Sequence, residues 1–419
     1  MKVVVAPSAL TGHDPGENLP PGVVSLSSLL NEHVDPRQQF GVESRLASSV
    51  HVDASQDVAV LPYSSGTTGL PKGVCLTHHN IVSNLMQLAE PKIRNQLPTT
   101  DGHQEVVLAL LPMFHIYGMV AVALQAISYG SKLVTLPKFE EKLFLKSLVE
   151  HEVTVLYLAP PLVLYLGSSP NVTKEHLKSV RVTVSGAAPI GRSDIIRCLD
   201  KSRQGNIYKQ GFGLTECSPA VCCCLNNSTN YASVGPPLAN TLVKVVDLTT
   251  GRSLPPNSKG EICVKGPQVM KGYLNNEVAT KEAIDDQGWF HTGDIGYYDE
   301  QHLFYVVDRL KELIKVKGFQ VAPAELEELL RSHAGVDDAG VIGVKDDRKG
   351  EHPVAFIKPS SISSPSEWRD LEASLRAFLK EKAADYKQIH EFVQIKMIPK
   401  SPAGKIMRKT LKEMYTPPK

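Results

Sequence analysis

The sequence predicts an α/β protein, with a large N-terminal domain of parallel sheets covered by helices plus a β subdomain, followed by a small α+β domain. Three features of the hydrophobic pattern indicate this fold class. Short apolar runs alternate with helix-period segments from residue 58, short strands separated by Gly, Pro and Asn follow residue 233, and helices mix with strands again after residue 312. At 419 residues the chain exceeds what one hydrophobic core usually supports, so more than one domain is expected.

The first region has the pattern of a buried parallel sheet. Its apolar runs have the length of strands, and the amphipathic segments between them suit crossover helices. The expected strands are residues 58–62, 106–111, 132–136, 153–158 and 180–185, and the expected helices are residues 81–88, 119–128, 140–151 and 192–199. Residues 15–56, rich in Pro, Gly, Ser and Asp, are expected to be mostly connecting chain, with one possible short helix at the apolar run of residues 23–30.

The second half of the chain predicts two further structural units. Short strands at residues 242–247, 260–264 and 303–307 favour an antiparallel β subdomain. Helices at residues 323–333 and 367–382 flank strands at residues 339–344 and 354–358, which suits a small α+β domain. We therefore expect one domain over residues 1–308 and a second over residues 309–419.

Charge and composition favour a small-molecule substrate. The chain has 45 Lys and Arg residues against 44 Asp and Glu residues, and no basic run of the kind that binds nucleic acid or an anionic membrane. No apolar run is long enough to predict a transmembrane helix. The seven cysteines are irregularly spaced and lack zinc-ligand spacing, so we expect reduced, intracellular thiols.

The most informative segment is residues 63–73, YSSGTTGLPKG, between a predicted strand and a predicted helix. Glycines let backbone N–H groups approach phosphate oxygens, hydroxyls donate hydrogen bonds, and a lysine adds a cation. The P-loop pattern does not fit, because it requires glycine at Pro71 and a hydroxyl at Gly73. The alternative to a phosphate-binding loop is a polar surface loop.

This loop resembles the signature of the adenylate-forming superfamily of acyl-CoA synthetases, luciferases and peptide-synthetase adenylation domains. Further blocks that resemble this superfamily follow in order: LPMFHIYG at 111–118, SGAAP at 185–189, QGFGLTE at 210–216, TGD at 292–294, DRLKELIKVKGFQ at 308–320 and PKSPAGK at 399–405. The resemblance covers residues 58–411 and is closest to 4-coumarate:CoA ligase-like enzymes. It implies an acid–thiol ligase that uses ATP, Mg²⁺ and coenzyme A.

The resemblance implies an ATP site whose residues suit the chemistry. Asp294 can accept hydrogen bonds from both ribose hydroxyls, Glu216 offers hard oxygen ligands to Mg²⁺, and Lys405 can neutralise charge when a carboxylate attacks the α-phosphorus. The complete expected ATP-binding set is Ser64, Ser65, Gly66, Thr67, Thr68, Lys72, Gln210, Gly211, Phe212, Thr215, Asp294, Arg309 and Lys405. Read without the resemblance, an isolated Asp after Gly is a turn residue and a lysine near the end of a chain is a solvated charge.

The acid and coenzyme A sites also follow from the resemblance. His115 is expected to be a catalytic residue that gates or positions the carboxylate, and Tyr117, Ala187 and Cys223 are expected in the acyl-pocket wall, although ordinary packing is the alternative. Lys311 matches a hinge about which the small domain rotates between the two half-reactions. The residues matched to thioester formation are Lys315 and Gln320, and those matched to coenzyme A contacts are Lys138, Lys317 and Gly318.

The sequence thus predicts an AMP-forming carboxylic acid:CoA ligase acting on an aromatic, 4-coumarate-like acid or a fatty acid. Two alternatives remain open: a luciferase-like monooxygenase, and a catalytically impaired nucleotide- or acyl-binding protein. The second arises because only sixty-three residues precede Ser64, which suggests a shortened N-terminal part relative to the family. The end of the chain, TPPK, lacks a Ser-Lys-Leu peroxisomal address, so the cytoplasm is favoured over the peroxisome.

Overall fold

The computed structural model describes residues 3–5, 23–25, 51–64, 71–316, 319–346, 350–362, 364–401 and 404–416. The chain divides into two compact units, Met1–Asp53 and Ala54–Lys419. In the first unit, strands β1 (Val3–Val5) and β2 (Val23–Ser25) pair in parallel. The apolar run expected as a possible short helix therefore begins with a strand. All other described elements belong to the second unit.

A six-stranded sheet with the order β11-β10-β9-β8-β6-β7 forms the centre of the second unit. All neighbouring pairs in it are parallel except β10–β11, which is antiparallel. The strands are β6 (Val106–Ala109), β7 (Lys132–Thr135), β8 (Val155–Leu158), β9 (Val182–Ser185), β10 (Ile207–Gly213) and β11 (Ala220–Cys223). The sequence predicted the mostly parallel sheet but not the last two strands. It also placed a strand at residues 58–62 in this sheet, which is wrong, because residues 58–60 pair antiparallel in a separate sheet.

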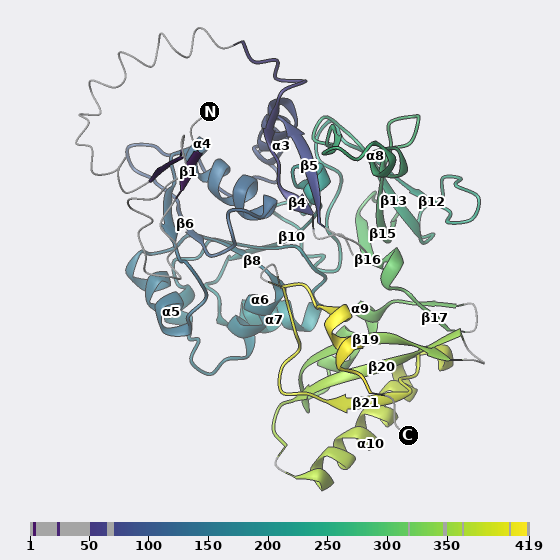
Figure 1. Cartoon of the computed structure of the whole chain (residues 1–419). Helices are drawn as coiled ribbons and strands as arrows, with labels where there is room; N and C mark the ends of the chain where they lie inside the picture. The colour runs from purple at the N-terminus through teal and green to yellow at the C-terminus, as the bar shows by residue number, and fades with distance from the viewer. Residues whose placement is uncertain are drawn as a thin grey trace. The chain divides into compact units, whose positions relative to one another are not determined.

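Helices cover both faces of this sheet because its strands are apolar on both sides (Figure 1). Leu156 and Leu158 of β8 belong to the hydrophobic cluster that contains side chains of α5–α7, whereas Val155 and Tyr157 belong to the cluster on the other side. The covering helices are α5 (Glu141–Glu150), α6 (Pro160–Ser168) and α7 (Arg192–Lys201) on one face, and the π-helix η1 (Tyr117–Leu124) with α4 (Gln125–Tyr129) on the other.

A second, small sheet carries the segment that leads into the glycine-rich loop. Its strands are β3 (Val58–Val60), β4 (Tyr63–Ser64), β5 (Lys72–Thr77) and β14 (Gly272–Tyr273). Helix α3 (His78–Leu88) begins directly after β5, where the Thr77 hydroxyl accepts a hydrogen bond from the backbone N–H of Asn80 at 3.2 Å. The Asn80 side chain accepts from the Thr77 N–H in return, which completes a capping box and fixes the start of the helix.

The β subdomain expected after residue 233 is a four-stranded antiparallel sheet with the order β12-β13-β15-β16. Its elements are β12 (Leu242–Val246), β13 (Gly260–Lys265), α8 (Glu277–Ala283), β15 (Phe290–Tyr298) and β16 (Phe304–Arg309). In the β15–β16 pair, Asp294 lies directly opposite Arg309.

The C-terminal region has its own five-stranded sheet and its own hydrophobic cores. Its elements are β17 (Ile314–Val316), β18 (Phe319–Val321), α9 (Pro323–Arg331), β19 (Val336–Asp346), β20 (Gly350–Pro359), α10 (Pro365–Lys382), β21 (Glu391–Gln394) and α11 (Arg408–Met414).

Short 3-10 helices occur in several parts of the second unit. They are η2 (Lys174–Leu177), η3 (Thr215–Cys217), η4 (Leu310–Glu312) and η5 (Asp385–Lys387).

The mixed α/β fold class predicted from the sequence is confirmed, while the domain boundary at 308/309 stays a prediction. Among the described residues, no helix combines the length and the apolar character that crossing a membrane requires.

Candidate functional site

A cavity of about 600 Å³ opens at the carboxyl ends of the parallel strands β8, β9 and β10. This end of a parallel α/β sheet is where such folds usually bind ligands. Residues that follow these strands line the cavity, among them Pro160, Gly186 and Leu214. Side chains from the end of β16 and from the segment before α11 line it as well.

The structure brings most of the expected site residues together around this cavity. Those that line it are Ser64, His115, Tyr117, Ala187, Gln210, Gly211, Phe212, Thr215, Glu216, Cys223, Asp294, Arg309 and Lys405. The sequence separation between Ser64 and Lys405 shows that the fold, not local proximity, assembles the set.

Other expected residues lie elsewhere. Lys72, Lys138, Lys311, Lys315 and Gln320 do not line the cavity. The expected ATP-binding residues Ser65, Gly66, Thr67 and Thr68, and the expected coenzyme A residues Lys317 and Gly318, lie outside the described residues.

Asp294 is a buried carboxylate with one satisfied oxygen. Its Oδ1 pairs with Arg309 Nε at 2.8 Å, whereas its Oδ2 has no hydrogen-bond partner among the described residues. Burial raises the pKa of Asp294 to about 6, and the positive charges of Arg309 and Lys405 oppose that shift. A buried, half-satisfied acceptor that faces a cavity is suited to a ligand that brings hydroxyl donors.

Asp294 lies in β15 where the pairing with β13 shifts register, and hydrogen bonds from β13 hold this irregular part of the strand. Gly293, at φ 68°, donates its N–H to Glu261 Oε1 at 3.0 Å. The Thr292 hydroxyl donates to the Ile262 carbonyl at 2.7 Å and accepts the Asp294 N–H at 3.0 Å. These contacts fix the backbone on both sides of the carboxylate.

Glu216 is buried on the cavity wall beside a tyrosine from the small sheet. The Tyr273 hydroxyl donates a hydrogen bond to Glu216 Oε1 at 2.9 Å, and the Glu216 backbone carbonyl accepts from the Met270 N–H at 2.8 Å. The ammonium of Lys72 lies 4.7 Å from the centre of the Tyr273 ring, which is cation–π range. Lys72 is therefore connected to Glu216 through Tyr273 although it does not line the cavity.

Lys405 reaches the cavity from a tight turn. Gly404 has φ 80°, and a Cβ at this position would lie 2.9 Å from the Cβ of Ala159, so glycine alone fits between the turn and the start of α6. Burial lowers the pKa of Lys405, as does the charge of Arg309, whereas Asp294 and Glu216 raise it. The lysine thus approaches the same space as two carboxylates.

His115 lies between the exposed Phe114 ring and the buried Ile116, which directly precedes η1. Its Nδ1 accepts the Tyr117 N–H at 3.3 Å, which leaves Nε2 as the nitrogen that carries the proton in the neutral ring. Burial lowers the pKa of His115, and the charge of Lys405 lowers it further. We therefore expect an uncharged imidazole at neutral pH.

The three expected acyl-pocket residues come from three different elements. Tyr117 begins η1 and donates its hydroxyl to the Val184 carbonyl at 3.3 Å, so it presents a ring rather than a free phenol to the cavity. Ala187 has φ 76°, a left-handed conformation that turns the backbone after β9. Cys223 is buried in β11, next to Gly211 in register.

Lys315 and Gln320 are exposed and lie opposite each other on the antiparallel pair β17–β18. Lys311 is exposed in η4, between the end of β16 and the start of β17. Lys138 is exposed after β7. Of the three expected catalytic residues in the C-terminal region, Lys405 lines the cavity, whereas Lys315 and Gln320 do not.

Two positioning residues were missed by the sequence analysis. Tyr273 lies in the segment KGYLNN, and Glu261 lies in GEICVKG, and both look like ordinary strand residues. Their partners are 57 and 32 positions away along the chain, so no spacing rule could connect them. A polar residue inside a short apolar strand was the only available signal for Glu261.

Comparisons with protein families identify the chain's relatives. Residues 4–274 match the model of the AMP-binding enzyme family, and residues 325–405 match the model of the AMP-binding enzyme C-terminal domain. The chain is 41% identical over 396 residues to 4-coumarate–CoA ligase 3 of Oryza sativa subsp. japonica, covering 93% of this chain and 69% of the relative. It is 42% identical over 371 residues to the 4-coumarate–CoA ligase of Pinus taeda, covering 87% and 66%.

Solved structures of the same architecture were found with ligands. The ATP-bound MatB from Rhodopseudomonas palustris superposes with a TM-score of 0.77 at 27% identity, covering 91% of this chain and 78% of that one. The o-succinylbenzoate CoA synthetase MenE from Bacillus subtilis, in complex with its acyl-adenylate intermediate, gives a TM-score of 0.75 at 30% identity, covering 93% and 74%.

The chain spans about two thirds of the length of the curated relatives that it matches. Three findings agree with one another: the matches to both family models, the identity to the 4-coumarate–CoA ligases, and the matching architecture. The chain therefore belongs to the AMP-binding enzyme family, as an acid–thiol ligase related to the 4-coumarate–CoA ligases.

Proposed function

We propose that this chain joins a carboxylic acid to coenzyme A through an acyl-adenylate, with cleavage of ATP to AMP and pyrophosphate. The observation that carries the proposal is the cavity in which the buried carboxylates of Asp294 and Glu216 and the ammonium of Lys405 come together. Three ionisable groups from three sequence-distant segments in one cavity suit a reaction between anions.

In the first half-reaction, a carboxylate oxygen of the acid attacks the α-phosphorus of ATP. A new C–O–P linkage forms, the bond to pyrophosphate breaks, and the electron pair leaves with the pyrophosphate. Because both reactants are negative, the chain contributes positioning and positive charge rather than a nucleophile. We assign the charge to Lys405 and the placement of the acid to His115, whose neutral ring can donate from Nε2.

The residues present fit a nucleotide and its divalent cation. The unpartnered Asp294 Oδ2 can accept one ribose hydroxyl and the Arg309-paired Oδ1 another. Glu216 keeps Oε2 available, since its only side-chain hydrogen bond given by the described residues is from Tyr273 to Oε1. Mg²⁺, when held there with Thr215 nearby, would neutralise phosphate charge.

In the second half-reaction, the sulfur of coenzyme A attacks the acyl carbonyl carbon. The thioester forms, the bond to AMP breaks, and the thiol proton is released. We propose that the small domain rotates about Lys311. The rotation would move Lys405 out of the cavity and bring in the β17–β18 surface that carries Lys315 and Gln320. Support comes from the exposure of these two side chains as a cross-strand pair outside the cavity. Lys138, Lys317 and Gly318 are proposed coenzyme A contacts.

We propose an aromatic acid as the substrate. Tyr117 and Tyr157 meet edge to face with ring centres 6.1 Å apart, and both line the cavity, which suits a flat apolar group. The names of the related 4-coumarate–CoA ligases agree with this class. We further propose the cytoplasm as the location, supported by seven free cysteines, most of which are buried.

The direct test is product analysis. The purified chain is incubated with Mg²⁺-ATP, coenzyme A and a panel of aromatic and fatty acids, and products are quantified by mass spectrometry. We expect equal amounts of acyl-CoA, AMP and pyrophosphate with an aromatic acid. Formation of ADP, or oxygen-dependent light emission without a thioester, would rule the proposal out.

A further inference from the structure

A glutamate, a cysteine and a histidine converge on one face of the β subdomain. Glu261 and Cys263 are two residues apart on β13, a spacing that places both side chains on the same face of a sheet. His291 of β15 lies directly opposite Cys263, and its imidazole contacts the Glu261 carboxylate. The carboxylate oxygen, the sulfur and the ring nitrogen all lie within 4.8 Å of one another. The fold therefore brings three kinds of metal ligand to one point.

The three groups meet at Nδ1 of His291. This nitrogen lies 2.8 Å from Glu261 Oε2 and 3.5 Å from Cys263 Sγ. The other ring nitrogen, Nε2, lies 3.6 Å from Asp285 Oδ2, and a carboxylate there favours a proton on Nε2. Nδ1 then presents a lone pair to the Glu261 carboxylate, so a positive charge is needed between them. A proton can join two of these atoms, whereas a metal ion can bind all three.

The separations suit a tetrahedral ion of the size of zinc. With a Zn–S bond of about 2.3 Å and a Zn–N bond of about 2.0–2.1 Å, the S···N edge of the tetrahedron is about 3.5 Å, as observed between Cys263 and His291. The N···O edge is about 3.3 Å, so Glu261 has to move by about half an ångström. The side chains of His291 and Glu261 are 33% and 14% exposed, which permits this movement and leaves a fourth position for water.

The surroundings of the cluster suit a bound divalent cation. Asp285 can hold the Nε2–H of the histidine, and a carboxylate in this place orients histidine ligands of metals. The carboxylate of Glu261 and a thiolate at Cys263 together balance two positive charges. Lys244 of β12 also lies opposite Cys263, and its ammonium lies over the Trp289 ring, 4.2 Å from the ring centre. The ring stabilises this cation outside the ligand set.

Metal binding must displace the thiol proton of Cys263. Burial raises the pKa of Cys263 to about 12, and the charge of Glu261 acts in the same direction, so the thiol is protonated in the metal-free chain. A thiol that coordinates a metal ion loses its proton. The S–H bond therefore breaks, a metal–sulfur bond forms, and the proton is released to the solvent.

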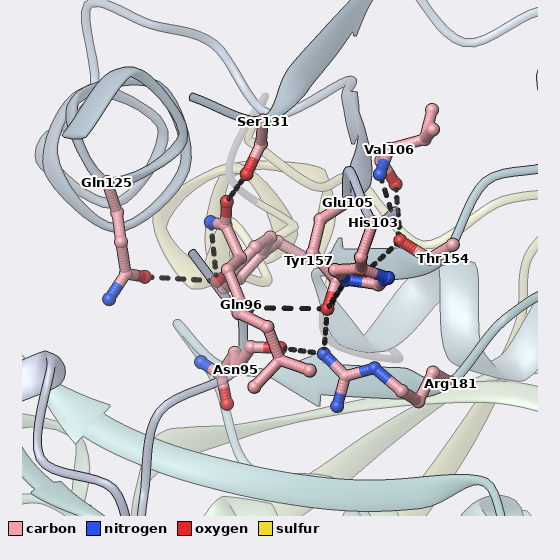
Figure 2. Close-up of polar contacts among 11 residues, drawn as sticks. Asn95, Gln96, His103, Glu105, Val106, Gln125, Ser131, Thr154, Tyr157 and Arg181 are labelled. Carbon is pink, nitrogen blue, oxygen red and sulfur yellow. Dashed lines mark hydrogen bonds and ion pairs between the residues drawn. The ribbon is translucent and has the colours of Figure 1, made fainter. Parts of the chain in front are cut away.

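A second contact between a histidine and a glutamate differs from this cluster (Figure 2). His103 Nε2 lies 3.4 Å from Glu105 Oε1, but that oxygen also pairs with the guanidinium of Arg181, and Oε2 accepts the Thr154 hydroxyl at 2.5 Å. A protein cation therefore already satisfies Glu105. None of the residues labelled in Figure 2 is a cysteine. The convergence of a thiol, an imidazole and a carboxylate thus distinguishes the site on β13 and β15.

We propose that Glu261, Cys263 and His291 bind Zn²⁺ or a chemically similar divalent transition-metal ion, which cross-links β13 and β15 beside Asp294. The role of the ion is structural. Glu261 binds it through Oε2 and keeps the Gly293 N–H on Oε1, so both contacts of the carboxylate persist. Neither half-reaction of the proposed function passes through this site.

Cobalt is the first probe, because Co²⁺ can occupy zinc sites and a cobalt–thiolate bond absorbs light. The full chain, without an affinity tag and after treatment with a chelator, is titrated with Co²⁺ alone and followed by absorption. We expect one equivalent to give a thiolate-to-cobalt charge-transfer band, and Zn²⁺, which binds such sites more tightly, to abolish it. Absence of the band at saturating Co²⁺ would leave a plain histidine–glutamate ion pair and overturn the proposal.

Variants of the cluster identify the ligands. Cys263→Ser should abolish the charge-transfer band because it removes the sulfur. His291→Gln should weaken Zn²⁺ binding at least about tenfold, and Asp285→Asn, which alters only the group behind the histidine, by about tenfold. Saturating Zn²⁺ should raise the melting temperature of the unmodified chain by at least about 2 °C, and Cys263→Ser should lose this rise.

Two further variants control for adventitious binding. Cys75→Ser removes the one cysteine of the chain that is not buried, and His103→Gln removes the histidine beside Glu105. Both should keep the band and the affinity for Zn²⁺. A band that survives Cys263→Ser, or one that disappears in Cys75→Ser, overturns the assignment whatever the exchange assay gives.

X-ray absorption by the zinc-loaded, unmodified chain gives a test that does not depend on the folding of any variant. We expect one sulfur ligand at about 2.3 Å among nitrogen and oxygen ligands at about 2.0–2.2 Å. A spectrum without sulfur, or one with two or more sulfur ligands, would contradict the ligand set.

Discussion

Asp294 combines burial, which opposes its charge, with a role that requires that charge. Its pKa of about 6 means that the carboxylate is ionised at neutral pH but close to protonation. The pKa of Asp294 lies above the ordinary range of an aspartate, so the carboxyl becomes neutral as the pH falls through about 6. A protonated Asp294 can no longer accept two hydrogen bonds from a ribose.

We predict that nucleoside binding depends on pH through this residue. Affinity for adenosine, which has no titrating phosphate, should fall about tenfold between pH 7.5 and pH 5 as the ionised fraction of Asp294 declines. Asp294→Asn should bind weakly at both pH values. Calorimetric titration at the two pH values measures this, and an undiminished affinity at pH 5 would remove Asp294 from the ribose site.

Tyr273 fixes one oxygen of Glu216, and its removal should change the response to Mg²⁺. We predict that Tyr273→Phe raises the Mg²⁺ concentration needed for half-maximal exchange by about tenfold, because a charge-assisted hydrogen bond that orients the carboxylate is lost. Tyr305→Phe is the control, since it removes a 2.8 Å hydrogen bond to Asp299 outside the cavity lining. An identical shift in both variants would argue against a specific role for Tyr273.

Sequence blocks located the residues that touch the cavity, but not those that hold them. The glycine-containing motifs have informative sequences, and they include Asp294, Glu216 and Lys405. Tyr273 and Glu261 act through contacts with residues far away in sequence, and nothing in their neighbourhood distinguishes them from ordinary strand residues. Hydrogen-bond partners of this kind are visible only after the chain has folded.

At the scale of elements, the site depends on the coupling between β13 and β15. Glu261 accepts the Gly293 N–H at 3.0 Å and pairs with His291 at 2.8 Å, so one side chain holds the irregular part of β15 before Asp294 at two points. This part of the strand needs such support because Gly293 has no side chain and adopts φ 68°.

We predict that Glu261 positions the part of β15 that carries Asp294. Glu261→Ala should raise the KM for ATP about tenfold with a smaller effect on kcat, whereas Glu261→Gln, which keeps a carbonyl acceptor for Gly293, should restore most of the loss. Steady-state exchange kinetics at varied ATP provide the measurement. Equal damage from both substitutions would indicate that the charge, not the hydrogen bond to Gly293, is what matters.

Short apolar runs and helical periodicity predicted the central elements well, and the elements that they missed have physical causes. Strands β6 to β9 and helices α5 and α7 match their expected ranges because buried parallel strands are apolar and their helices amphipathic. Strand β10 was missed because its sequence, IYKQGFG, contains a lysine and two glycines. Lys209 is tolerated there because two oxygen acceptors satisfy its ammonium.

At the scale of the whole molecule, the C-terminal region presents two chemically different surfaces. Lys405 lies in the cavity, on a turn packed against the start of α6, while Lys315 and Gln320 are exposed on β17–β18. The expectation of two surfaces came from the resemblance to the family. No hydrophobic pattern in the sequence indicates these surfaces.

We predict that the two lysines affect different half-reactions. Lys405→Ala should slow adenylation by about 10²- to 10³-fold and leave thioester formation from supplied acyl-adenylate largely intact, because a charge in the cavity acts on the first step. Lys315→Ala should show the opposite bias. Rapid-quench measurement of each half-reaction decides, and equal loss of both steps in either variant would invalidate the two-surface assignment.

The central claim is that this cavity adenylates a carboxylic acid, and acid-dependent ATP–pyrophosphate exchange by the purified, monodisperse chain tests it most directly. The account predicts exchange that requires Mg²⁺ and an aromatic acid and that falls at least about 10²-fold in Lys405→Ala. Absence of exchange with every acid from a folded chain, or exchange that persists in Lys405→Ala, would contradict it.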